Sequence, residues 1–454
     1  MNISETTQEE KARIIHSLSF ASNSGFGKIF EDESTCQKSY EKLQNYVTAV
    51  SNKVLSDKRT QEYIGDDWET VWGPVVYSND QNSSFARADN TMGVYFSKAQ
   101  KLFVIAIAGT NSISSFGWMK EDFDVKNTKK WRSITGSGYG SISQGTATGL
   151  HILTKEMQSD GTDFFTAITK FISDKKIEET EIAVTGHSLG GALSPALALF
   201  ISDKKAELGS KTAITISTYP SAGPTIGVET SFFRSSTSFI HYYEKQIKDK
   251  KIHYHGVKND LDIVPMAWDK NDLVKIPDLY SNKKITNENF KTLALVAILN
   301  TINKDRFPPQ VVYKQIQPLK SLGGTFNDPM DNKARELFNF FRENPILTDS
   351  WIPKPLQGNL KDLESLTRFF AQAAYQHVTA YDELLGITNF MKQYKEVAKE
   401  VNTNDANAPE IAANSEQMAF GLASEAVGFD INSLLELSEL NDEELKKLTE
   451  EGEE

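Results

Sequence analysis

The residues with the clearest capacity for chemistry are those of the segment Gly186–Gly190, which reads GHSLG. The apolar stretch Ile182–Thr185 before it predicts a strand, and Gly191–Ile201 after it predicts a helix. A serine on a sharp strand-to-helix turn has an exposed hydroxyl, and the helix N-terminus adds a positive dipole and N–H groups. We therefore predict that Ser188 is a nucleophile that attacks an acyl carbonyl.

A serine hydroxyl is a poor nucleophile until a base takes its proton, and a carboxylate must hold that base. On a strand–turn–helix scaffold of this kind, the order along the chain is serine, acid, histidine. Asp260 and Asp262 both follow a predicted strand at Ile252–Val257, so either could supply the acid. His377 is the only histidine later in the sequence, and we predict that it is the base.

Four segments of the chain, in order, resemble the class 3 lipases, the family of the triacylglycerol lipases of filamentous fungi. They are Ile107–Thr110 (IAGT), Val184–Leu193 (VTGHSLGGAL), Gly223–Phe232 (GPTIGVETSF) and Asn259–Pro265 (NDLDIVP). The likeness extends from about Val94 to Pro265 and, more loosely, over His377–Tyr381. It implies an α/β-hydrolase fold and the hydrolysis of esters.

The resemblance also implies roles for individual residues. It places the acid directly before Ile-Val-Pro, at Asp262, and leaves Asp260 as a solvated loop residue. A tetrahedral oxyanion needs two N–H donors, which we expect from Leu189, after the nucleophile, and from Thr110, at the end of the preceding strand. The chain departs from the family at Ala108, where arginine is usual, which puts a supporting ion pair in doubt.

The segment after Thr110 (NSISSFGWMKEDFDV) mixes apolar and charged residues, and the corresponding region forms a lid in class 3 lipases. The lid candidates are Ile113, Phe116 and Trp118. An amphipathic flap would cover an apolar cleft in water and open on lipid. Two alternatives are an ordinary buried helix in this segment and a site covered by residues 266–375 instead.

We predict neither a metal nor a cofactor. His253 and His255 alternate on a predicted strand, but no nearby cysteine or HExxH pattern completes a zinc site. The glycine-rich segment Gly136–Gly140 lacks the preceding strand and following helix of a nucleotide-binding loop. His187 is expected to pack beside the nucleophile.

The elements that must position these residues alternate between strands and helices, which predicts an α/β fold with a mostly parallel central sheet flanked by helices. The expected strands are Met92–Ser97, Leu102–Ala108, Ile182–Thr185, Ala213–Tyr219 and Ile252–Val257. The expected helices include Tyr40–Asp57, Thr146–Met157, Thr162–Asp174, Gly191–Ile201 and Tyr381–Val401. We divide the chain into a helical N-terminal cap (1–70), a hydrolase domain (71–400) with a long insertion (266–375) before the histidine, and an acidic, partly flexible helical tail (401–454).

The composition is typical of a soluble globular protein. Of the 454 residues, 39% are hydrophobic and 24% charged, enough to bury a sizeable core. The net charge of −12 argues against nucleic-acid binding and gives no general attraction to anionic membranes, so lipid contact should be local, apolar and transient.

The single cysteine, Cys36, excludes an intramolecular disulfide. With no signal-peptide pattern and no apolar stretch long enough to span a bilayer, we expect a cytoplasmic protein or one exported without a cleavable signal peptide.

Together these features predict a serine ester hydrolase, a lipase or carboxylesterase that cleaves acyl esters of lipids through a Ser-Asp-His triad and an acyl-enzyme. A phospholipase, or an effector that cleaves membrane lipids, would use the same chemistry with a different head-group pocket. A non-catalytic, lipase-like scaffold is the third hypothesis. The presence of Ser188, Asp262 and His377 in one chain argues against it.

Overall fold

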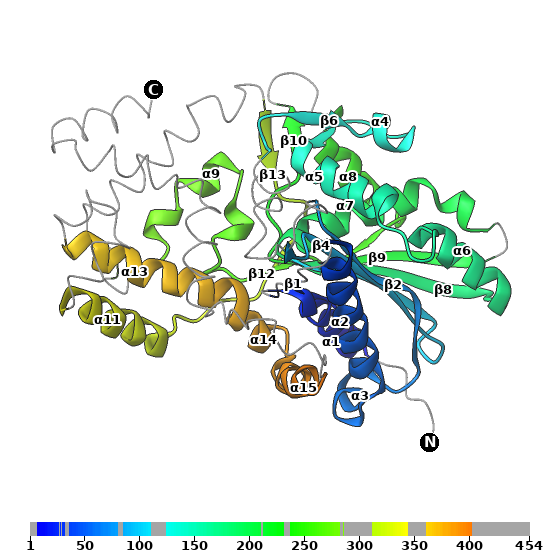
Figure 1. Cartoon of the computed structure of the whole chain (residues 1–454). Coiled ribbons are helices and arrows are strands. Elements are labelled where there is room, and N and C mark those ends of the chain that lie inside the picture. The colour runs from blue at the N-terminus through cyan, green and yellow to red at the C-terminus, as the bar shows by residue number, and fades with distance from the viewer. Residues whose placement is uncertain are drawn as a thin grey trace.

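The computed structural model describes residues 7–26, 28, 30–31, 36–79, 85–109, 124–209, 212–230, 237–281, 285, 311–343 and 360–401. A central sheet runs through the molecule with helices on both of its faces (Figure 1). This is the α/β architecture that the alternation of strands and helices predicts. No helix in the described ranges is long and apolar enough to cross a membrane.

The central sheet has the strand order β14-β12-β9-β8-β5-β4-β2, with β11 paired to β9. Its strands are β2 (Trp68–Tyr77), β4 (Asn90–Ser97), β5 (Leu102–Ile107), β8 (Glu179–His187), β9 (Ala213–Ser221), β11 (His253–Tyr254), β12 (Val257–Lys258) and β14 (Lys320–Ser321). The pairs β2–β4 and β4–β5 are antiparallel, and the pairs from β5 to β14 are parallel. The carboxyl ends of β5, β8 and β9 therefore meet at one edge, where open α/β sheets bind their ligands.

The side chains of β5 alternate between two hydrophobic cores, one on each face of the sheet. One core receives Phe103, Ile105 and Ile107. The other receives Leu102, Val104 and Ala106. A strand that is buried on both faces has an almost continuous apolar sequence, which is why the stretch LFVIAI was recognisable as a strand.

Helices cover both faces of this sheet. On the first face lie α5 (Gln144–His151), α6 (Phe164–Lys175), α7 (Leu189–Asp203) and α8 (Phe239–Lys248). On the second lie α1 (Gln8–Ala21), α2 (Cys36–Ser56), α3 (Lys58–Ile64) and α15 (Thr388–Lys399). Helices α1 and α2 pack directly on the sheet, and α3 and α15 pack against these two helices and against each other.

The described parts of 266–375 contribute a strand to each of two sheets and a pair of longer helices. Strand β13 (Val311–Lys314) belongs to a second sheet of order β13-β10-β7-β6, with β10 at Gly227–Thr230, β7 at Ser141–Ser143 and β6 at Thr128–Lys130. Helices α11 (Asp328–Glu343) and α13 (Leu360–Ala374) pack side by side (Figure 1). Between them, the Arg368 guanidinium donates to the Asp331 carboxylate at 2.6 Å.

Two predicted elements are interrupted. Residues 252–257 form two short strands, β11 and β12, with a break at Gly256, a residue that weakens strands. The predicted helix Tyr381–Val401 is instead α14 (Ala380–Leu384) followed by α15. Gly386 lies between them with φ +68°, the left-handed conformation in which glycine commonly ends a helix. Apart from Val401, the predicted tail (401–454) lies outside the described residues.

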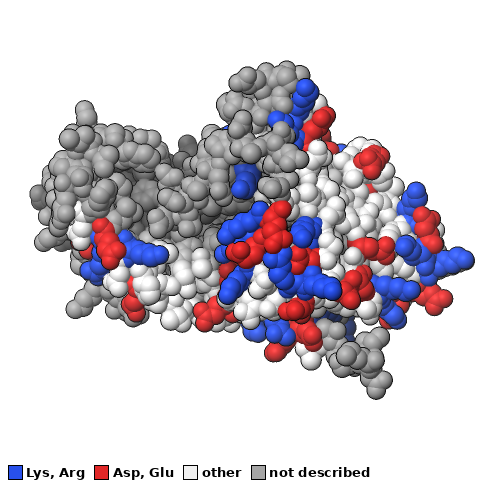
Figure 2. All heavy atoms as spheres, turned by 60° about the horizontal axis from the view of Figure 1, so that its bottom comes forward, with Lys and Arg blue, Asp and Glu red and all other residues white. Residues whose placement is uncertain are grey.

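Charges of both signs are interspersed over the face that carries the N-terminal helices (Figure 2). Several of them form pairs. Arg59 on α3 contacts Asp57 at 2.8 Å and Glu400, just beyond α15, at 2.8 Å. Lys11 on α1 contacts Glu181 on β8 at 2.7 Å. These partly exposed pairs orient neighbouring elements and contribute little free energy of folding individually.

Candidate active site

Ser188 occupies the sharp turn between β8 and α7. Its backbone has φ 58° and ψ −122°, a conformation that is costly for any residue other than glycine. A Cβ added at Gly186 would lie 2.3 Å from the backbone of Gly190, and one at Gly190 would lie 2.4 Å from the Ile107 carbonyl oxygen. The glycines on both sides of the serine are therefore required by close backbone packing.

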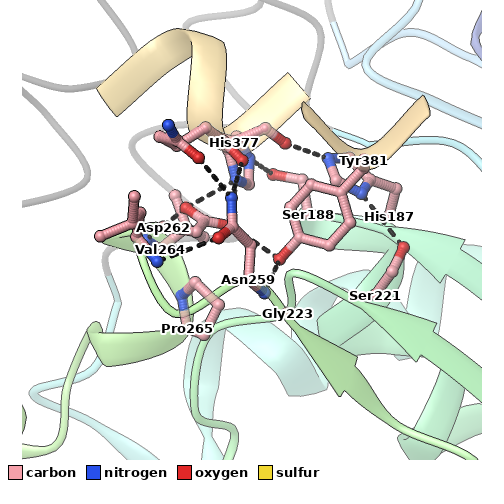
Figure 3. Close-up of polar contacts among 12 residues, drawn as sticks. His187, Ser188, Ser221, Gly223, Asn259, Asp262, Val264, Pro265, His377 and Tyr381 are labelled. Carbon is pink, nitrogen blue, oxygen red and sulfur yellow. Dashed lines mark hydrogen bonds and ion pairs between the residues drawn. The ribbon is translucent and has the colours of Figure 1, made fainter. Parts of the chain in front are cut away.

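His377 lies directly against this serine (Figure 3). Its Nε2 is 2.9 Å from the Ser188 Oγ. The histidine belongs to a π-helical turn, Tyr375–Thr379, between α13 and α14, and only 2% of it is exposed. The only histidine after the acid motif is thus within hydrogen-bond reach of the serine, although 189 residues separate them in sequence.

Asp262 holds the other side of the imidazole. Its two carboxylate oxygens lie 3.1 and 3.0 Å from the His377 Nδ1. The carboxylate also accepts the Val264 N–H at 3.0 Å and the Tyr381 hydroxyl at 3.0 Å. A carboxylate that only accepts requires a proton on Nδ1, which leaves Nε2 free to accept the proton of Ser188.

Asp260, the other acid candidate, does not reach the histidine. It is exposed, and its carboxylate accepts a hydrogen bond from the Ser321 hydroxyl on β14. Asp262, in contrast, is 1% exposed. The geometry therefore favours Asp262, the position that the family resemblance implies.

A network of buried groups holds the loop that carries Asp262. The Tyr381 hydroxyl accepts the Asn259 N–H at 2.8 Å while it donates to Asp262. The Asn259 side-chain amide donates to the carbonyl and side-chain oxygens of Gln376 at 2.9 and 2.8 Å, next to His377 (Figure 3). Burial, and then the Asp262 carboxylate, raise the pKa of the Tyr381 hydroxyl well above its usual range, so this hydroxyl remains a donor.

Of the two expected N–H donors to the oxyanion, only that of Leu189 lies among the described residues. Leu189 is the first residue of α7, so its N–H has no partner within that helix. Thr110 and the lid candidates Ile113, Phe116 and Trp118 lie outside the described residues.

Gly109, which precedes Thr110, lies just beyond the end of β5 and close to the serine turn. A Cβ added at Gly109 would be 3.0 Å from the His187 carbonyl oxygen and 3.4 Å from the Ser188 Cβ. The end of β5 therefore adjoins the serine turn, and Gly109 permits the close approach.

Two contacts near the site involve residues that the sequence did not single out. The Asn23 side chain, in the 3₁₀ turn after α1, accepts the Gly109 N–H at 2.8 Å. The Gln315 side chain, directly after β13, donates to the carbonyl oxygens of Gly223 and Pro265 at 2.9 and 2.8 Å. No sequence motif marks Asn23 or Gln315, whereas Asn259 and Tyr381 lie within segments that resemble the lipase family.

His253 and His255, which alternate along the chain, lie in different environments. The His255 ring stacks on Tyr219 with ring centroids 4.5 Å apart, and His253 is exposed. Within the described ranges, no group of three or more histidine, cysteine, aspartate or glutamate side chains could hold a metal ion.

The mostly parallel sheet, the strained serine turn and the buried aspartate–histidine pair are the parts of an α/β-hydrolase. Residues 104–271 match the family model for lipase (class 3), which confirms the resemblance seen in the sequence motifs. No curated protein matches the chain.

Solved lipase structures are similar to this chain. The crystal structure of M37 lipase is 27% identical, with a TM-score of 0.54, and the match covers 87% of this chain and 98% of that one. Lipase II from Rhizopus niveus is 19% identical (52% and 77% covered, TM-score 0.32), and the Rhizomucor miehei lipase–propeptide complex is 18% identical (57% and 63% covered, TM-score 0.35). The family match and the M37 lipase structure support a lipase-type ester hydrolase with the α/β-hydrolase fold.

Proposed function

We propose that the protein hydrolyses acyl esters of lipids by nucleophilic catalysis at Ser188. The observation that carries the proposal is the continuous chain of short contacts from the Ser188 Oγ to the His377 Nε2, and from the His377 Nδ1 to Asp262. The base is thus within hydrogen-bond distance of the nucleophile on one side and of the orienting acid on the other, as acyl transfer requires. The same contacts favour catalysis over the scaffold hypothesis.

The reaction follows from this arrangement. His377 takes the Ser188 proton as the Oγ attacks the ester carbonyl, and the imidazolium is stabilised by Asp262. The N–H groups of Leu189 and Thr110 are proposed to stabilise the oxyanion. His377 then donates its proton to the leaving alcohol, which leaves an acyl-enzyme on Ser188. Water, deprotonated by the same histidine, hydrolyses the acyl-enzyme and regenerates the serine.

The test is the Ser188→Ala variant in the full chain. We expect hydrolysis of p-nitrophenyl butyrate and of tributyrin to fall by about 10⁶-fold, to background, and labelling by a serine-reactive fluorophosphonate to disappear. Full activity in this variant would refute the proposal. Triacylglycerol specificity is part of the proposal, and faster cleavage of a phosphatidylcholine than of a triglyceride would assign the enzyme to phospholipids instead.

A matched control is available on the same helix. Ser194 lies on α7, six residues after the nucleophile, and its buried hydroxyl has no hydrogen-bond partner among the described residues. Ser194→Ala removes the same atom without removing a hydrogen bond among the described residues. We expect it to keep both esterase activity and fluorophosphonate labelling.

A further inference from the structure

His187, the last residue of β8, lies between the serine turn and the histidine-bearing turn. It is 6% exposed. Its ring lies 4.8 Å from the ring of Phe20 on α1, 4.9 Å from that of His377 and 4.9 Å from that of Tyr381 (centroid distances). The side chain thus contacts three separate elements that meet at the candidate active site.

Both ring nitrogens of His187 have a specific partner (Figure 3). Nε2 lies 2.8 Å from the backbone carbonyl oxygen of His377, and Nδ1 lies 3.1 Å from the Ser221 hydroxyl. A carbonyl oxygen can only accept, so Nε2 must carry a proton. Burial, and then the neighbouring His377, hold the pKa of the His187 imidazole well below its usual range, so the ring is neutral. Its Nδ1 is therefore bare and accepts the proton of the Ser221 hydroxyl at 3.1 Å, a shorter contact than the 3.4 Å from that hydroxyl to the Gly186 carbonyl oxygen.

Ser221 completes a connection back to the nucleophile. It is the last residue of β9, and its carbonyl oxygen accepts the Ser188 N–H at 3.0 Å. Three hydrogen bonds thus link the backbone of the serine to the backbone of the base, through Ser221 and His187. In each of these three hydrogen bonds, the donor and the acceptor are assigned.

The base needs a backbone support as well as a side-chain support. Asp262 fixes how the His377 ring is turned, because it binds Nδ1. It does not fix the peptide to which the ring is attached, and that peptide belongs to a single π-helical turn between two α-helices. The contact from His187 supplies the missing constraint at the His377 carbonyl.

We propose that His187 is a positioning residue for the reaction: its Nε2–H holds the carbonyl of His377 and so sets the distance between the base and Ser188. This inference rests on the proposed function. A displacement of about 1 Å in such a contact can reduce the rate by about 10²-fold. A residue that only filled space would act on stability and not on this distance.

Two variants separate positioning from packing. His187→Phe keeps a flat ring but removes both hydrogen bonds. His187→Gln can again present an N–H to the His377 carbonyl and an oxygen to Ser221. On p-nitrophenyl butyrate we expect kcat of His187→Phe to fall by about tenfold to a hundredfold with KM nearly unchanged, and His187→Gln to recover most of the loss. Wild-type kcat in both variants, or an equal loss in both, would overturn the proposal.

A second measurement needs neither variant to be active. In ¹⁵N-labelled wild-type protein at pH 7, the imidazole signals of His187, assigned by their absence from the His187→Gln spectrum or by selective labelling, should show a protonated Nε2 and a bare Nδ1. An imidazolium or a protonated Nδ1 would overturn the proposal even if His187→Phe failed to fold. Failure of Ser188 to react with a fluorophosphonate would refute the proposed function and leave this tautomer result standing, so the two failures are distinguishable.

Discussion

Replacing Asp262 by asparagine tests the acid's role with little change in shape. The carboxylate oxygen Oδ1 accepts the Val264 N–H at 3.0 Å, so in the variant this position must hold the amide oxygen. The amide NH₂ then occupies the position of Oδ2, which faces the His377 Nδ1 at 3.0 Å and the Tyr381 hydroxyl at 3.0 Å. Two N–H donors cannot face each other at that distance.

The imidazole can avoid this conflict in one way. It loses the proton on Nδ1, accepts from the asparagine and carries its proton on Nε2 instead. In that tautomer Nε2 donates toward the Ser188 Oγ, 2.9 Å away, and cannot take the serine's proton. We expect kcat to fall by about 10⁴-fold, as happens when a triad carboxylate becomes an amide, which corresponds to about 5 kcal/mol of lost transition-state stabilisation. The overall shape of the site should change little, but the Tyr381 hydroxyl loses the acceptor that it has at Oδ2, so we also expect the free energy of unfolding to fall by about 1–3 kcal/mol.

The assay is initial-rate hydrolysis of p-nitrophenyl butyrate, with thermal unfolding followed in parallel. The control is Asp260→Asn, the same chemical change two residues earlier on an exposed side chain that does not reach His377. We expect the control to retain its kcat. The reasoning is refuted if Asp262→Asn keeps more than about a tenth of the wild-type kcat while remaining folded, or if both variants lose activity equally.

Three further predictions concern stability and the strand end beside the serine. Gly190→Ala would place a Cβ 2.4 Å from the Ile107 carbonyl oxygen and should destabilise the fold by about 3 kcal/mol; an unchanged urea midpoint would contradict this. Burial lowers the pKa of His16 from 6.5 to about 4, so the unfolded chain binds a proton first and stability is lost as the pH falls through this window, by about 2 kcal/mol at pH 5. His16→Phe should abolish that part of the pH dependence in urea unfolding at pH 7 and pH 5, and an identical loss in both proteins would exclude His16 as its source. Asn23→Ala removes the acceptor of the Gly109 N–H and the donor to the Phe20 carbonyl oxygen, and should cost about 1–3 kcal/mol and lower kcat; an unchanged kcat and urea midpoint would contradict this.

The parts of the fold that the sequence predicted are those in which short-range pattern and burial agree. Strand β5 is apolar on both faces, so its sequence alone predicts a strand between two helical layers. The serine turn consists of a strand, two glycines that close packing requires and a helix, all within the 25 residues from Glu179 to Asp203. The strand and the helix each have a local sequence pattern that predicts them. The interruption at Gly386 was missed, because the apolar spacing continues through it and only the left-handed backbone ends the helix.

The contacts that hold the site together were harder to predict, since they join residues far apart in sequence. His377 was assigned as the base by elimination, and nothing in the local sequence predicts that its carbonyl faces His187. Asn23 lies 86 residues before the glycine whose N–H it accepts. Polar side chains of this kind carry no periodic pattern, so only the folded arrangement brings them together.

The predicted insertion, which lies between the proposed acid and the proposed base, is attached to the rest of the fold close to both residues. Asp262 and His377 are 115 residues apart, yet the entropy cost of closing a loop grows only slowly with its length. The site requires only that contacts hold the chain in place near the proposed acid and again near the proposed base. Gln315 binds the carbonyl oxygen of Pro265, three residues after the acid, and the Gln376 side chain, next to the base, donates to the Thr325 carbonyl oxygen at 2.8 Å. Because these attachments lie close to the proposed acid and base, we predict that substitutions elsewhere in the described parts of 266–375 leave the Ser188–His377 geometry unchanged.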